Sequence, residues 1–245
     1  MRMISAWRKH RREGTLGAVL LRALRLPNRE IVANHYHGDV AAGYLRERTH
    51  EEKWKRENEI MEEFMAEFPE GAAVLDVPFG TGRFVPLYHR RGLRVSGLDI
   101  SADMLRAAEQ ALGEEAFSAC RTVIGSADAL PFEDHAFDVI VSCRFFSLIS
   151  YAMAQRVLAE FRRVGRKRVL LTIRLRKERT GRGQRMYDAV LQRLGFAPSW
   201  KKNMNGRIRE KDFLELLRAF NLRATKARIV EEDETTRAMF YACHR

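Results

Sequence analysis

The chain has 245 residues and a formal net charge of +12, with 46% hydrophobic and 31% charged residues. That length is enough to close the core of one α/β domain without disulfides or a structural metal. The three cysteines lie far apart, so they form neither a metal-ligand spacing nor a disulfide framework, and we expect a reducing, cytoplasmic setting. No apolar run is long enough to span a bilayer.

The positive charge is concentrated in two segments. Residues 1–28 carry seven Lys or Arg and one Glu, and residues 162–211 carry seventeen Lys or Arg and three acidic residues. Such a field steers anionic partners toward a protein without identifying the anion. A basic surface with no binding role is the alternative interpretation.

Residues 1–28 combine the basic run Arg8–Arg12 with an apolar stretch, Leu16–Leu24, whose leucines mostly share one helical face. This pattern predicts a helical arm that contacts a membrane surface or an anionic acceptor, or that packs on the domain. A secretory signal is not expected, because the stretch is short, contains Arg22 and lacks a small-residue cleavage site.

Residues 29–48 are weakly patterned but contain several side chains suited to acid–base chemistry, including His37 and Tyr44. Thr49 and Glu52 then form a capping-box signature, which predicts a helix that continues to about Phe68. His35 and His37 have no obvious carboxylate or cysteine partner, so no metal site is expected.

The next stretch, residues 73–84, reads Ala-Val-Leu-Asp-Val-Pro-Phe-Gly-Thr-Gly-Arg-Phe. An apolar run ending at Asp76, followed by Gly80 and Gly82, predicts a buried strand that passes through a glycine turn into a helix. In open α/β sheets such a junction lies at the carboxyl edge, where ligands bind. Glycine has no Cβ, so it lets the backbone approach a ligand closely.

Two cofactor classes use such a turn. Dinucleotide enzymes have a third small residue, G-x-G-x-x-G, but Val85 stands at that position. Asp76 also suits an amine-bearing ligand better than a pyrophosphate. The stretch resembles motif I of the class I S-adenosylmethionine-dependent methyltransferases, usually V-L-D-V-G-x-G-x-G. Pro78 replaces the first glycine, so either the turn already has φ near about −65° there or the site is impaired.

Further acidic residues at strand ends extend the resemblance to roughly residues 70–175. Leu93–Asp99 reads as a second strand, and Asp99 lies seventeen residues after Gly82, close to the spacing of a ribose-binding acid. Ser101 is placed to cap the helix that follows. Residues 122–124 and 137–142 read as two more strands, with Asp128 between them. In the family, the residue matching Asp128 faces the adenine amine.

The resemblance implies S-adenosylmethionine as cofactor. The cofactor-binding residues that it implies are Asp76, Pro78, Phe79, Gly80, Thr81, Gly82, Asp99, Ile100, Met104, Asp128, Ala129 and Cys143. In the family, the segment before the first strand shapes the acceptor site, so His37 and Tyr44 are candidate bases. Arg144, directly after the fourth strand, is a candidate to hold an acceptor phosphate or carboxylate; a structural ion pair is the alternative.

Residues 143–147 lie where methylators of amino groups in nucleic acids and glutamine often carry Asp, Asn or Ser, then Pro-Pro and an aromatic residue. That motif is absent, which disfavours these enzymes. After a helix at 152–164 and a strand at 169–173, residues 174–209 form a basic insertion with Tyr187 and Trp200. Basic and aromatic side chains together suit phosphates and rings, and a solvated basic face is the alternative.

The last elements are a helix at 211–220 and strands at 223–230 and 237–243, which would complete the family's sheet. We therefore expect a doubly wound α/β, Rossmann-like sheet of seven strands whose last strand is antiparallel. Residues 1–48 would form a basic arm and lid, and residues 49–245 the methyltransferase domain, with the insertion at 174–209 recognising the acceptor.

The sequence is compatible with three functions. The first is methyl transfer to an anionic small molecule, or to a phosphorylated glycan or lipid head group at a membrane surface that residues 1–28 contact. The second is an RNA methyltransferase, acting on rRNA or tRNA, that tracks phosphates with both basic segments. The third is a regulator that binds S-adenosylmethionine without turnover, motivated by Pro78.

Overall fold

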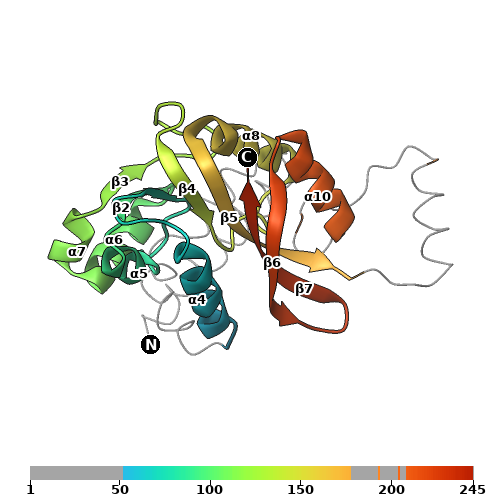
Figure 1. The fold of residues 1–245 in the computed structure, drawn as a ribbon, viewed down its shortest axis with the longest axis horizontal. Helices are drawn as coiled ribbons and strands as arrows, with labels where there is room; N and C mark the ends of the chain where they lie inside the picture. The colour runs from blue at the N-terminus through green and yellow to red at the C-terminus, as the bar shows by residue number, and fades with distance from the viewer. Residues whose placement is uncertain (1–51, 178–192, 194–203, 205–207, 245) are drawn as a thin grey trace, which may run out of the picture.

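The computed structural model describes residues 52–177, 193, 204 and 208–244. At its centre is a seven-stranded sheet with the order β3-β2-β1-β4-β5-β7-β6 (Figure 1). β1 pairs in parallel with β2 and β4, whereas β7 is antiparallel to both β5 and β6. The order reverses at β1, so the carboxyl ends of β1 and β4 flank the topological switch point where ligands bind in such sheets.

The strands agree with the sequence expectation in order and type, and the antiparallel last strand is confirmed. Their bounds are β1 Ala73–Asp76, β2 Arg94–Asp99, β3 Arg121–Ile124, β4 Phe137–Ser142, β5 Gly165–Arg176, β6 Arg223–Glu232 and β7 Thr236–His244. The central strands are buried on both faces and consist of continuous apolar runs, as parallel strands covered by helices do.

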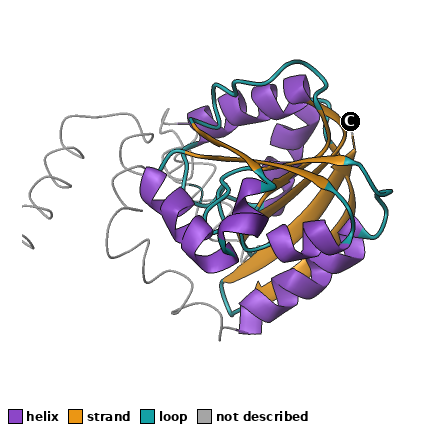
Figure 2. Ribbon diagram, turned by 90° about the vertical axis from the view of Figure 1, so that its left-hand side faces the viewer, coloured by secondary structure: helices purple, strands orange, loops and turns teal. Residues whose placement is uncertain are grey.

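Helices cover both faces of the sheet (Figure 2). Their bounds are α4 Glu52–Met65, α5 Val85–Arg90, α6 Ala102–Leu112, α7 Glu114–Ser118, α8 Tyr151–Val164 and α10 Glu210–Ala219. Apolar side chains of α4, α5 and α6 pack in one core cluster, and those of α8 and α10 pack in the other. The short α7 is an element that the sequence did not predict.

Local signals account for several helix boundaries. The hydroxyl of Ser101 accepts a hydrogen bond from the backbone N–H of Met104 and caps α6 as expected, and Ser150 caps α8 in the same way. The first residues of the expected helix before β1 lie outside the described part of the chain, so the capping box at Thr49 is not tested.

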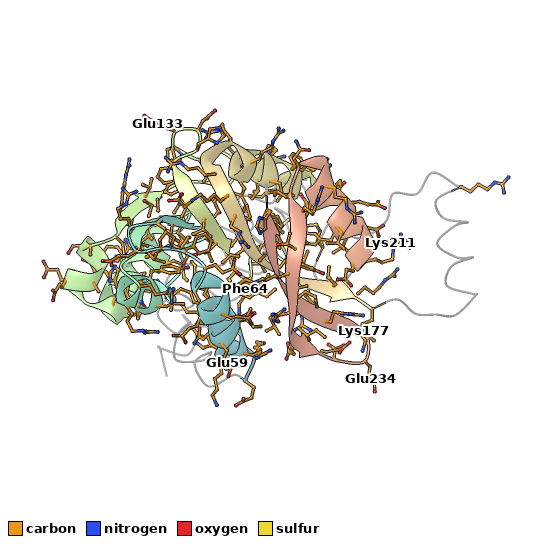
Figure 3. The ribbon with its side chains drawn as sticks, viewed as in Figure 1. Glu59, Phe64, Glu133, Lys177, Lys211 and Glu234 are labelled. Atoms are coloured by element: carbon orange, nitrogen blue, oxygen red, sulfur yellow. The ribbon has the colours of Figure 1, made fainter. Side chains whose placement is uncertain are left out.

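α4 lies across β6 and β7 and joins the part of the chain before β1 to the end of the sheet. Phe64 on α4 points toward these strands (Figure 3), and its ring packs edge-on against Phe240 with 5.4 Å between ring centres. Glu63 forms an ion pair with Arg228 at 2.5 Å, and Glu67 pairs with Arg168 at 2.6 Å. These contacts hold the last turn of α4, and the residues just after it, against β5, β6 and β7.

β5 runs three residues further than expected, to Arg176. The backbone N–H of Arg176 donates to the carbonyl of Ile208, so both ends of the basic insertion meet beside the sheet. Met204 and Ile208 are fully buried in the core cluster with α10. The remainder of the insertion lies outside the described residues, except for an exposed Arg193, as does the arm at residues 1–48.

Candidate functional site

Asp76 and Asp99 end adjacent parallel strands, so both carboxylates lie at the carboxyl edge of the sheet. Asp76 is buried between β2 and β4, and the hydroxyl of Tyr88 on α5 donates to its Oδ2 at 3.1 Å. Burial raises the pKa of Asp76 to about 8, although the hydrogen bond from Tyr88 opposes the shift. Arg83 also lowers this pKa, but burial dominates, so Asp76 is largely protonated at neutral pH.

Asp99 has a different environment. Its Oδ2 accepts the backbone N–H of Gly80 at 2.8 Å, and its Oδ1 accepts that of Ser101 at 2.9 Å. One carboxylate thus links the glycine turn after β1 to the start of α6. A carboxylate can accept about four hydrogen bonds, so these two are compatible with a vicinal diol as a further donor.

The glycine turn has the backbone conformation that its residues predict. Gly80 and Gly82 have φ of +57° and +65°, in the left-handed region that side chains disfavour. A Cβ at Gly82 would lie 2.6 Å from Leu112 of α6, so this glycine allows close helix packing rather than ligand contact. The Val77–Pro78 peptide bond is cis.

The ring of Phe79 packs in the core against β2. A Cβ at Gly97 would lie 2.2 Å from the Phe79 ring, so the ring occupies the space that a side chain on β2 would need. The ring is buried and packs against Phe117 of α7.

A cavity, here called the apolar pocket, opens over the ends of β1, β2 and β4. Six of the predicted cofactor residues line it, namely Pro78, Gly80, Asp99, Ile100, Met104 and Cys143. Arg144, predicted as a catalytic residue, also lines the apolar pocket. The sequence did not identify the other lining residues, which are Val77, Leu98, Gly125, Ser126, Ala127, Phe145, Leu148 and Met153. A Cβ at Gly80 would lie 3.7 Å from Met104 across this space, so the bare backbone keeps the pocket open.

A second cavity, here called the charged pocket, adjoins the first and shares Pro78, Gly80, Cys143 and Arg144 with it. Its other lining residues are Trp54, Asp76, Phe79, Thr81, Arg83 and Phe84. Asp76, Phe79 and Thr81 were predicted to bind the cofactor, and they line this cavity rather than the apolar pocket. Burial raises the pKa of the Cys143 thiol, so the sulfur between the two pockets stays neutral.

Glu57 of α4 lies between two arginines beside the charged pocket, a contact that the sequence did not suggest. Its carboxylate accepts from Arg83 Nη1 at 2.6 Å and from Arg144 Nε at 2.9 Å. Trp54, one turn earlier, lies under both guanidinium groups, with centroid distances of 3.7 and 5.0 Å. Arg83 also donates to the Trp54 carbonyl at 2.7 Å, so it fastens the glycine turn to α4.

Arg144, the one predicted catalytic residue within the described chain, lies where both pockets meet. Its φ of +57° is uncommon for a residue with a side chain. The hydroxyl of Thr172 on β5 accepts its backbone N–H at 2.7 Å and helps to hold this conformation. His37 and Tyr44 lie outside the described residues.

Three predicted residues, Gly82, Asp128 and Ala129, are not among those that line either pocket. The carboxylate of Asp128 accepts from the Ser126 hydroxyl at 2.5 Å and pairs with Arg156 of α8 at 3.1 Å. Ala129 donates its backbone N–H to the carbonyl of Ser126. Neither residue is among those that line the apolar pocket, whereas their neighbours Ser126 and Ala127 are.

Basic residues at the base of the insertion are paired with acids at the end of β6 and in the turn that follows it. Arg174 contacts Glu231 and pairs with Asp233 at 3.2 Å, and Lys177 pairs with Glu232 at 2.9 Å. These ion pairs favour a structural role for this part of the insertion.

Within the described residues there is no cluster of three or more His, Cys, Asp or Glu side chains that could hold a metal ion. In the same part of the chain, no helix combines the length and the apolar character needed to cross a membrane.

Comparison with known proteins agrees with this geometry. Residues 74–168, which contain both strand-end acids and the glycine turn, match the family model described as a methyltransferase domain. Residues 74–168 are therefore similar to methyltransferase domains. The lining of the apolar pocket lies wholly within these matched residues, whereas α4, β6 and β7 lie outside them.

Curated relatives of the methyltransferase domain match over part of their length. A demethylmenaquinone methyltransferase of Thermotoga maritima is 35% identical over 123 residues, which is 49% of this chain and 49% of the relative. A phosphatidylethanolamine N-methyltransferase of Cereibacter sphaeroides is 35% identical over 98 residues, 40% of this chain and 47% of the relative. The chain thus spans about half the length of the curated relatives that it matches.

Solved structures share the fold of the methyltransferase domain at low identity. A magnesium protoporphyrin IX methyltransferase from Synechocystis PCC 6803 with bound SAH has a TM-score of 0.65 at 14% identity, covering 89% of this chain and all of that one. A geranyl diphosphate C-methyltransferase from Streptomyces coelicolor has a TM-score of 0.62 at 14% identity, covering 90% and 99% of the two chains. At this identity the likeness concerns the fold alone.

Proposed function

We propose that this protein transfers a methyl group from S-adenosylmethionine to a small-molecule acceptor. The proposal rests on two acids that end adjacent strands beside a glycine turn. Asp99 lines the apolar pocket and Asp76 lines the charged pocket, and the two pockets share one wall. The match of residues 74–168 to methyltransferase domains supports it.

The residues present fit the proposed cofactor. The apolar pocket, with Leu98, Met104 and Ala127 on its walls, suits a planar purine, and Asp99 at its rim suits a ribose diol. The charged pocket suits an amino acid, because Asp76 can accept from an ammonium group. An ammonium beside Asp76 would favour the ionised carboxylate and so lower its pKa from about 8.

When bound, S-adenosylmethionine supplies a methyl group on a sulfonium centre, which is already a good leaving group. The work left to the protein is therefore to bind, orient and exclude water, and alignment of two bound reactants supplies much of a rate enhancement. Asp99 ties the glycine turn to the start of α6, and Arg83 ties it to α4, so hydrogen bonds fix the wall between the two pockets at both sides. A base is needed only where the acceptor must first lose a proton, and we assign that role to His37 or Tyr44.

The acceptor is proposed to be anionic: a small molecule, or a phosphorylated glycan or lipid head group. Support comes from the two guanidinium groups against one carboxylate beside the charged pocket. One curated relative is named for a phosphatidyl lipid, which fits the same chemistry. Contact of residues 1–28 with a membrane surface and a cytoplasmic location belong to this proposal.

The RNA interpretation receives less support. Arg174 and Lys177, at the base of the insertion, are paired with acids and so are less suited to tracking phosphates. RNA binding would weaken linearly in a plot of log affinity against log salt. Affinity for mixed RNA no tighter than about millimolar at low salt would remove this alternative.

Transfer of labelled methyl tests the proposal directly. The full chain is incubated with tritiated S-adenosylmethionine and a cell extract, and the label is followed into lipid, small-molecule, RNA and protein fractions. Label in the lipid or small-molecule fraction is expected. Tight binding of S-adenosylhomocysteine with no transfer to any fraction would favour the regulator without turnover instead.

A further inference from the structure

A groove opens at the amino edge of the sheet, at the opposite ends of the strands from the two pockets. It has a volume of about 710 Å³, which is within the range of small-molecule sites. The first residues of four parallel strands line it, namely Ala73, Arg94, Arg121 and Phe137. The ends of α5 and α7 and the loop before β4 supply the rest of its lining. We call this cavity the amino-edge groove.

Strand geometry brings three polar side chains to one face at this edge. Arg94 and Ser96 are two residues apart on β2, so their side chains share a face of the sheet. Arg121 on β3 is the register partner of Ser96, and neighbouring strands lie about 4.8 Å apart. Both guanidinium groups and the Ser96 hydroxyl therefore line the same groove.

The two arginines of the amino-edge groove carry charges that no acid neutralises. Arg94 donates through Nε to the Gly71 carbonyl at 3.0 Å, and the Arg121 guanidinium lies 5.7 Å from the centre of the Phe132 ring. These contacts orient the guanidinium groups, but neither partner is negatively charged. Among the described residues no carboxylate forms an ion pair with either arginine, whereas Arg163 on α8 is paired with two acids.

The remaining polar groups of the amino-edge groove narrow the kind of ligand. Glu133 is exposed at its rim and projects from the loop before β4 at the top of Figure 3. Two positive charges thus face one negative charge. An arginine fork matches the oxygens of a phosphate, and Glu133 and Ser96 can form hydrogen bonds with hydroxyl groups.

We propose that the amino-edge groove is a second ligand site, which binds a phosphorylated polyhydroxy molecule, such as a sugar phosphate, with its phosphate between Arg94 and Arg121. Arg94 begins β2 and Asp99 ends it, so about 17 Å of strand separate this site from the cofactor pockets. A phosphate bound there would not contact the methyl donor. The site therefore does not depend on the proposed function.

A titration followed by nuclear magnetic resonance tests the site. Backbone amide signals of the isotope-labelled full chain are recorded while inorganic phosphate or ribose 5-phosphate is added at constant ionic strength. We expect saturable shifts at Ser96 and Arg121, with a Kd on the order of millimolar for inorganic phosphate. Ribose 5-phosphate should bind at least about threefold more tightly, because its hydroxyl groups add hydrogen bonds.

Two results of this titration would overturn the proposal. One is the absence of a saturable shift at Ser96 and Arg121 with either ligand up to about 50 mM. The other is a set of shifts centred on Gly80 and Asp99, which would place the anion in the cofactor pockets instead.

Three substitutions with matched charge changes complete the test. Arg94→Gln and Arg121→Gln should each weaken inorganic phosphate about fivefold or more, because a charge-assisted hydrogen bond is lost. Arg56→Gln on α4 is the control: it removes the same charge from an exposed residue that does not line the groove, and it should change the Kd less than about twofold. Equal weakening by all three would show that net charge governs binding, and would overturn the site.

Glu133→Gln gives a change of the opposite sign, which a loss of folding cannot imitate. Removing this carboxylate should tighten inorganic phosphate about twofold or more, because one repulsive charge leaves the groove. Thermal unfolding checks that each variant is folded. An unchanged or weaker affinity in folded Glu133→Gln would contradict phosphate binding beside this residue.

Discussion

At the scale of single residues, two acids at adjacent strand ends differ because of what surrounds them. Asp76 has one hydrogen bond, from Tyr88, and lies in the core, so its pKa rises to about 8. Asp99 accepts two backbone N–H groups across the mouth of the apolar pocket. Asp76 is suited to bind a cation. Asp99 is suited to hold the glycine turn and to accept hydrogen bonds from a diol.

Asp76 should make stability without ligand depend on pH. Its ordinary pKa is 3.8, so between about pH 4 and about pH 8 the folded state keeps a proton that the unfolded state releases. The free energy of unfolding should therefore be fully supported by this group below about pH 4 and decrease as pH rises toward 8. Asp76→Asn should flatten this decrease. Urea unfolding across the window measures it, and parallel curves for both proteins would contradict the shifted pKa.

Asp99→Asn should weaken nucleoside binding whether or not the amino-acid end is present. We expect losses of about 1–3 kcal/mol for both S-adenosylhomocysteine and 5′-methylthioadenosine, because a charged acceptor for the ribose is removed. Calorimetry with both ligands gives the comparison. Asp103→Asn, in the first turn of α6, is the control and should change neither affinity. Unchanged binding by Asp99→Asn would remove the ribose assignment.

At the scale of elements, α4 is the helix that completes the site. It precedes β1 in the chain and brings Trp54 and Glu57 against the turn after β1 and against the end of β4. The side chain of Glu57 is 5% exposed, and it is the carboxylate that both arginines contact. The position of α4 therefore decides where both guanidinium groups lie.

Removing the Glu57 charge should be costly because it leaves two little-exposed arginines without this carboxylate. We expect Glu57→Gln to lower the free energy of unfolding by about 3 kcal/mol or more, the usual cost of breaking a buried ion pair from one side. Glu59→Gln on the same helix breaks an exposed pair with Arg56 and should cost less than about 1 kcal/mol. Urea unfolding measures both losses in the free energy of unfolding. Equal losses would show that burial of the Glu57 ion pairs does not increase their contribution to stability.

At the scale of the whole molecule, the two pockets are built from elements between α4 and α8, with lining residues from Trp54 to Met153. A ligand that bridges them would therefore stabilise the folded state as a unit. The positive charge available to an anionic partner is smaller than the composition suggests. Arg168, Arg174 and Arg228, for example, are paired with acids.

S-adenosylhomocysteine should accordingly raise the melting temperature. At one hundred times its dissociation constant, a ligand specific for the folded state adds about 2.7 kcal/mol. In a chain of this size that corresponds to a rise of roughly 5–10 °C. NADH, which a dinucleotide site would bind, serves as the control in a thermal-shift measurement. A rise with NADH but not with S-adenosylhomocysteine would exclude the proposed cofactor.

The fold followed from local signals in the sequence. So did six of the predicted cofactor-binding residues, which line the apolar pocket. An apolar run, an acid and a glycine turn define the β1–α5 junction, and Ser101 caps α6 through its own hydroxyl. These features depend on residues close in sequence, so they can be read without the tertiary structure. The direction of Phe79 could not be read in this way, because it depends on the empty space above Gly97 on the neighbouring strand.

Sequence alone thus determined the sheet, its switch point and the acids at its edge, because backbone propensity and hydrophobic periodicity are local properties. Only the tertiary structure decided which side chains face each pocket. Glu57 meets Arg144 across 87 positions of sequence, and Asp128 contacts Arg156 of α8. Such contacts depend on where a helix packs relative to a strand end, and neither partner carries a local signal of the other.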